Sequence, residues 1–178
     1  MRAMRPRSID EFFPKRFSLK LENAKTIPDI FEVVKEAVQV REGVTRAGLM
    51  LGLAELGGSA DSFIGGLHPL GTNIIVLNKV PLRRVQESDP ELYKPYVFHV
   101  LLHEYLHTVG LVDEDGTGRR TLDITRSLFG ADHLATKIAE DIGKYLPYIT
   151  YPVRMPLPEG TQIELVEGFD RSSTTYFA

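Results

Sequence analysis

The chain contains no cysteine among its 178 residues, and this absence excludes two kinds of structure. Disulfide bonds cannot form, and no thiolate is available to bind a metal. No apolar stretch approaches the roughly 20 residues that a transmembrane helix requires. We therefore expect no membrane-spanning segment, and we expect any metal to be held by histidine, aspartate or glutamate.

A strong charge of either sign is also lacking. The formal net charge is -3, which argues against a nucleic-acid partner and against an anionic membrane surface. Positive charges gather near the N-terminus, but Pro14, Lys15 and Arg16 interrupt the sequence where an apolar segment would follow. No secretory signal is therefore expected, and the cytoplasm is the expected location. No pattern specifies an oligomeric state.

The chain that remains has the composition of an ordinary globular protein. Hydrophobic residues make up 43% and charged residues 25%, and the length suits one domain with or without an arm. We expect an N-terminal arm over residues 1–25 and one domain over residues 26–178. Apolar spacing and turn residues predict helices at 28–42, 90–109, 120–129 and 131–146, and strands at 45–56, 63–67, 73–78 and 162–166.

The predicted helix that ends near Val109 is unusual because it is apolar on nearly every side. A helix of this kind is normally buried, and buried polar groups are costly unless they have partners. Polar side chains nevertheless interrupt it at His99, His103, Glu104, His107 and Thr108. We interpret this polar strip as a functional site, although His99 is more typical of a core histidine.

Three of these polar residues have the spacing of a catalytic metal site. His103 and His107 are four residues apart, so they lie on one face of a helix and can bind one metal ion. Glu104 lies beside that ion, where it can act as general base on a metal-bound water. Since two imidazoles suit zinc, the sequence predicts one zinc ion per chain.

At this point the chain resembles the zincin metallopeptidases, whose HExxH motif it carries as His103-Glu104-Tyr105-Leu106-His107. The resemblance covers about residues 73–146. It implies an α+β fold: a single zincin-like domain in which a small mixed β-sheet packs on the active-site helix, with further helices after it. It also implies that residues 73–78 form the edge strand along the cleft, and that the substrate is a peptide or protein.

The third metal ligand is open among three residues. His133 is the preferred ligand, because later helices supply this ligand in one zincin branch, although there it is a glutamate. Asp113 would complete a metzincin-like pattern, with Met155 in the methionine turn, and Glu140 lies on the helix of His133. Asp113 also suits an ordinary polar turn.

Two other functions compete with peptide hydrolysis. One is a metal-dependent hydrolase of a non-peptide substrate such as RNA, but the HxxxHxxxxxH pattern of such enzymes fails here at Asp113. The other is a catalytically silent zincin-like binding module. The intact Glu104 argues against this second alternative, because a purely structural zinc site has no use for that carboxylate.

Overall fold

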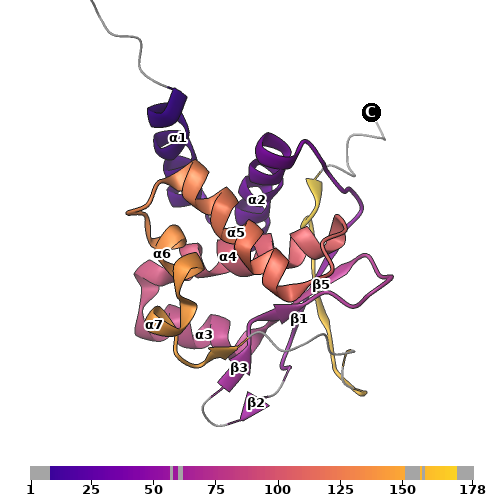
Figure 1. The fold of residues 1–178 in the computed structure, drawn as a ribbon. Coiled ribbons are helices and arrows are strands. Elements are labelled where there is room, and N and C mark those ends of the chain that lie inside the picture. The colour runs from indigo at the N-terminus through magenta and orange to yellow at the C-terminus, as the bar shows by residue number, and fades with distance from the viewer. Residues whose placement is uncertain (1–8, 57, 60–61, 151–156, 158, 172–178) are drawn as a thin grey trace, which may run out of the picture.

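The chain folds as helices packed on one face of a small sheet (Figure 1). The computed structural model describes residues 9–56, 58–59, 62–150, 157 and 159–171. The helices of this part are α1 (Ile9–Asn23), α2 (Ile27–Glu42), α3 (Lys79–Ser88), α4 (Pro90–Thr108), α5 (Glu114–Phe129), α6 (Leu134–Glu140) and α7 (Ile142–Tyr145). The strands are β1 (Met50–Ala54), β2 (Gly58–Ser59), β3 (Ser62–Ile64), β4 (Gly66–Leu67), β5 (Ile74–Asn78), β6 (Ile149–Thr150) and β7 (Glu164–Val166).

The four-stranded sheet is mixed and has the order β4-β5-β1-β7. β1 pairs in parallel with β5 and antiparallel with β7, and β4 is antiparallel to β5. A smaller sheet has the order β2-β3-β6. The prediction of a mixed α+β fold in one domain is therefore confirmed. Within the described residues, no helix has both the length and the apolar character needed to cross a bilayer.

The prediction that residues 73–78 form the edge of the sheet is wrong. β5 lies between β4 and β1, and β4 is the strand at that end. The expectation of an edge at 73–78 came from the resemblance to zincins; here the two-residue strand β4 takes that edge, and Gly65 separates it from β3 of the smaller sheet. A Cβ atom on Gly65 would lie 3.1 Å from Tyr96 Oη and 3.2 Å from a methyl group of Val100, so glycine lets the chain pass close over α4.

Helix α4 is the centre of the core, as its apolar sequence predicts. It packs against α2, α3, α5 and α6 and against β4 and β5. Side chains on the helix-facing side of the sheet, such as Leu51 and Ile75, are fully buried in the same cluster as Val97, Leu101 and Leu106. Burial of α4 on all sides from Pro95 to Leu106 fixes the positions of His99, His103 and Glu104.

Two helical regions differ from the sequence prediction. Residues 9–23, predicted as part of an arm, form α1, and its Phe17 is fully buried in the main core. Residues 113–118, predicted as a polar turn, instead contain the start of α5. Asp113 is the N-cap of that helix, and its Oδ2 accepts a hydrogen bond of 2.7 Å from the Gly116 N–H. This cap begins the helix six residues earlier than expected.

Candidate metal centre

Three side chains from two helices converge at the end of α4. His103 and His107 come from its last two turns, and Glu114 is the first residue of α5. His103 Nε2 lies 2.9 Å from Glu114 Oε2, and His107 Nε2 lies 3.1 Å from Glu114 Oε1. The two Nε2 atoms are 3.2 Å apart. Among the described residues, this is the group of His, Asp and Glu side chains that could hold one metal ion.

The distances fit the ligands of a tetrahedral ion. Zinc bonds of 2.0–2.1 Å place neighbouring ligand atoms of a tetrahedron about 3.3 Å apart. The separation of the two Nε2 atoms, 3.2 Å, is close to this value, and these atoms lie 2.9 Å and 3.1 Å from the two different oxygens of the Glu114 carboxylate. Two imidazoles and one glutamate are also a known ligand set of catalytic zinc sites, which keep their fourth position for water or substrate. The residues present therefore fit a catalytic zinc ion.

A backbone carbonyl group fixes the orientation of the His107 ring. Its Nδ1 lies 2.7 Å from the carbonyl oxygen of Leu111, to which an Nδ1–H group can donate. With the proton on Nδ1, the lone pair of Nε2 faces His103 and Glu114. A backbone carbonyl that holds the far nitrogen of a histidine is a common feature of metal-binding imidazoles.

The turn between the two helices returns the chain to His107. Gly110 has a φ of 114°, a backbone conformation that costs glycine little but strains other residues. The Leu111 N–H donates to the carbonyl oxygen of Leu106 at 3.1 Å. This reversal directly after α4 brings Glu114 back beside the two histidines.

Burial dominates the electrostatics of the site. Burial lowers the pKa of His103, and the neighbouring His107 lowers it further, although Glu114 acts in the opposite direction. His99, one turn earlier, is buried and has its pKa lowered to about 3 by burial and by His103. Both rings are therefore uncharged at neutral pH. For His103, the uncharged imidazole is the form that binds a metal.

Glu104 occupies a different position from the three converging side chains. It is only 4% exposed, and burial followed by the charge of Glu114 raises its pKa to about 8. The backbone N–H of His68, the residue after β4, hydrogen-bonds to Glu104 and partly offsets this rise. The carboxyl group of Glu104 thus lies between α4 and the end of β4, beside the cluster and outside it.

The structure does not bring the other predicted ligands to this cluster. His133 caps α6, where its Nδ1 accepts a hydrogen bond of 3.1 Å from the Ala135 N–H. It lines a cavity of about 610 Å³ together with residues of α1 and the first turns of α4. Asp113 caps α5, and Glu140 pairs with Arg126. Met155 lies outside the described residues.

Sequence reasoning missed Glu114, the residue next to the candidate Asp113. The signal that could have found it is the helix start itself: an N-cap aspartate followed by acidic residues in a first turn. Gly116 and Gly118, which disfavour a helix, concealed this signal. Comparison with protein-family models, with curated proteins and with solved structures finds no match to this chain.

Proposed function

We propose that the chain is a zinc-dependent metallopeptidase, with His103, His107 and Glu114 as metal ligands and Glu104 as the catalytic base. The observation that carries the proposal is that the two Nε2 atoms from α4, 3.2 Å apart, each lie within 3.1 Å of a carboxylate oxygen of Glu114 from α5. With both Nε2 atoms deprotonated, the two imidazoles and the carboxylate form a set of lone pairs that a divalent cation can bind. Zinc has the geometry that these distances fit.

The bound metal and Glu104 would have different roles in the reaction. Bound zinc supplies Lewis acidity, which lowers the pKa of a coordinated water to about 7 and polarises a carbonyl group. Glu104 takes the proton of the attacking water and delivers it to the leaving amine. Its burial beside the two histidines holds the carboxyl group where it can exchange a proton with the attacking water.

A peptide substrate is supported by the position of β4. This strand is at one end of the sheet order in the described chain, and the residue that follows it, His68, donates its backbone N–H to Glu104. A peptide that adds to β4 as a further strand would hold its backbone in an extended form and pass next to the base. This arrangement favours an extended peptide over a compact non-peptide substrate.

The test combines metal content with hydrolysis. After zinc reconstitution, the wild-type protein is expected to hold about one zinc per chain and to cleave internally quenched peptides from a mixed library. Glu104→Gln is expected to keep its zinc and to lose at least about 100-fold in kcat/KM. Glu91→Gln is the matched control, since Glu91 is exposed at the start of the same helix.

Each alternative function has its own outcome in this test. Zinc binding without cleavage of any peptide would favour a silent binding module or a non-peptide substrate. Cleavage that survives Glu104→Gln would contradict the assigned base. A wild-type protein that takes up no zinc would remove the metal site altogether.

A further inference from the structure

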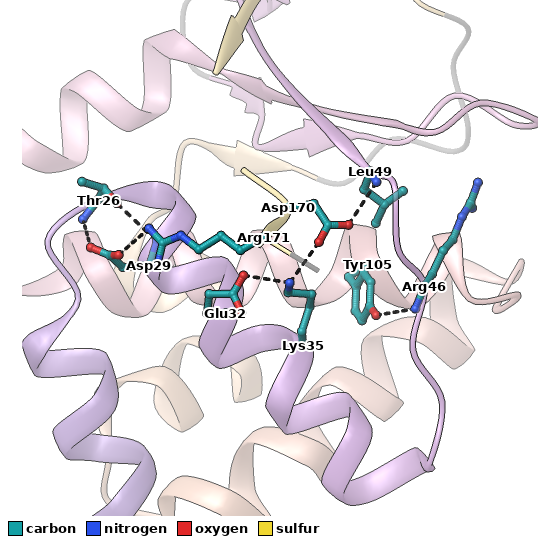
Figure 2. A network of polar contacts seen from close by, with 9 residues as sticks. All are labelled: Thr26, Asp29, Glu32, Lys35, Arg46, Leu49, Tyr105, Asp170 and Arg171. Carbon is teal, nitrogen blue, oxygen red and sulfur yellow. Dashed lines mark hydrogen bonds and ion pairs between the residues drawn. The ribbon is translucent and has the colours of Figure 1, made fainter. Parts of the chain in front are cut away.

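One arginine outside the candidate metal centre contacts both elements that position Glu104. Arg46 lies in the connection between α2 and β1. Its backbone N–H donates to the hydroxyl of Tyr105 at 2.8 Å (Figure 2). Its guanidinium donates to the carbonyl oxygen of Thr108 at 2.8 Å through Nη1 and to that of Thr72 at 3.0 Å through Nη2.

The first element that Arg46 contacts is the end of α4. Tyr105 directly follows the base Glu104, and Thr108 directly follows the ligand His107. Thr108 is the last residue of α4, and the last carbonyl groups of a helix lack partners within the helix. Arg46 supplies such a partner at the turn that carries His107, and its positive charge suits the negative end of the helix dipole.

The second element is the turn between β4 and β5. Thr72 closes this turn through hydrogen bonds of its N–H and its hydroxyl to the carbonyl oxygen of Pro69, at 3.2 Å and 2.6 Å. The turn begins at His68, whose N–H bonds to Glu104, and the His68 Nδ1 lies 2.9 Å from the carbonyl oxygen of Ile74. Arg46 therefore contacts the segment that positions the hydrogen-bond donor of the base.

We infer that Arg46 is a positioning residue for the reaction: it holds the end of α4 and the 68–73 turn at a fixed separation, so that Glu104 keeps its place beside the metal ligands. This inference rests on the proposed function. Arg46 does not belong to the ligand cluster, so its effect acts through Thr108 and Thr72. The planar guanidinium has two donors that point to separate acceptors, whereas a lysine ammonium is a single centre and does not reproduce this fork.

The experiment compares Arg46→Ala and Arg46→Lys with the same two substitutions at Arg83. Arg83 is a suitable control because it is 59% exposed and pairs with the equally exposed Glu55. Four quantities are measured on zinc-reconstituted protein: kcat, KM, the dissociation constant for zinc, and the visible spectrum after replacement of zinc by cobalt. The spectrum reports the geometry of the ligands independently of hydrolysis.

We expect Arg46→Ala to lower kcat about 30-fold, because a displacement of roughly 1 Å at reacting groups can cost about 100-fold. KM should change less than about threefold, and the zinc dissociation constant should rise about tenfold, as for residues that support metal ligands. Arg46→Lys should restore little of kcat, and the cobalt spectrum of both variants should shift. The Arg83 variants should match the wild type in all four quantities.

The inference is overturned if kcat stays within twofold of wild type in Arg46→Ala, or if Arg46→Lys restores it fully. Equal losses in the Arg83 variants would also overturn it. If Arg46→Ala does not fold, Arg46→Lys and Arg46→Gln decide by the same criteria. A wild-type protein without zinc uptake or cleavage contradicts the proposed function itself, whereas an active wild type with unaffected Arg46 variants contradicts only this inference.

Discussion

Two clusters of polar side chains, one formed by Lys35 and Asp170 and the other by His103, His107 and Glu114, satisfy their charges in different ways. The first joins Lys35 of α2 to Asp170 near the end of the described chain (Figure 2). Their side chains are 11% and 2% exposed. Asp170 binds the Lys35 ammonium at 3.0 Å with one oxygen and accepts the Leu49 N–H at 3.1 Å with the other. Positive and negative groups are both supplied by the chain.

The second cluster, that of His103, His107 and Glu114, contains no such balance. Two imidazoles and a carboxylate present lone pairs to one point, and none of the three is a permanent cation. A complete pair such as Lys35–Asp170 needs nothing from solution and serves to join α2, the connection before β1 and the C-terminal segment. The second cluster is incomplete in the sense that it contains no permanent cation and can bind one from solution, and this difference separates a structural network from a candidate binding site.

The largest expected effect comes from breaking the Lys35–Asp170 pair. Asp170→Ala removes the buried partner of the Lys35 ammonium, which keeps its second partner Glu32 at 2.7 Å, and should lower the free energy of unfolding by about 3 kcal/mol. Replacing both residues, as Lys35→Met with Asp170→Leu, should cost much less. Urea denaturation measures both, with the exposed Asp132→Ala as control. A loss below about 1 kcal/mol in Asp170→Ala would show that this pair is not the anchor described.

Breaking the cluster of His103, His107 and Glu114 should lower metal affinity and leave the fold intact. Glu114→Gln removes the charged ligand and should weaken zinc binding by at least about 100-fold, measured by competition with a chromogenic chelator. The unfolding free energy of the metal-free protein should stay within about 1 kcal/mol, because the Glu114 side chain is 30% exposed and the amide oxygen of glutamine can still accept a hydrogen bond from an imidazole. Asp115→Asn is the control, since Asp115 is the exposed neighbour on the same turn. Unchanged zinc affinity in Glu114→Gln would contradict the ligand assignment.

A third effect concerns the pH dependence of the metal-free protein. The pKa of Glu104 is raised from 4.5 to about 8 in the folded chain, mainly by burial. Between these values the unfolded chain has released this proton and the folded chain retains it, so the free energy of unfolding falls as the pH rises. Glu104→Gln lacks this contribution, and near pH 8 it should be the more stable protein by on the order of 2 kcal/mol.

The measurement is chemical denaturation at pH 4.5 and pH 8 in the presence of a chelator. Wild type and Glu104→Gln should differ less at pH 4.5, where the carboxyl group is protonated in the folded chain and about half protonated in the unfolded chain. Glu91→Gln, at an exposed position of the same helix, should follow the wild type at both pH values. Parallel curves for wild type and Glu104→Gln would show that burial does not perturb this carboxyl group.

The parts of the site that could be predicted from the sequence are those set by local geometry. His103 and His107 lie on one face because a helix repeats every 3.6 residues, and the apolar surroundings of these residues already indicated that the helix is buried. The strand at 73–78 could likewise be recognised from its β-branched run. Its neighbours in the sheet could not, because strand order depends on contacts between segments far apart in the chain.

Recognition of Glu114 as part of the site depends on two features that sequence patterns describe poorly. One is the direction of the chain after α4, which a single left-handed glycine, Gly110, reverses. The other is the first turn of α5, which forms despite two glycines because Asp113 caps it and Thr117 is fully buried against the core. Tertiary packing overrode helix propensity there, and the ligand came from a region predicted as a turn.

The smallest expected effect tests the residue that the sequence favoured in place of Glu114. His133 caps α6 through its Nδ1 and packs its ring 4.7 Å from that of Phe129. His133→Ala should lower the free energy of unfolding by about 1 kcal/mol, while the protein still binds one zinc per chain with unchanged affinity. His133→Asn should recover part of the stability, since asparagine is a good N-cap. Loss of zinc in both variants would restore His133 as a ligand and require α6 to move toward the end of α4 when the metal binds.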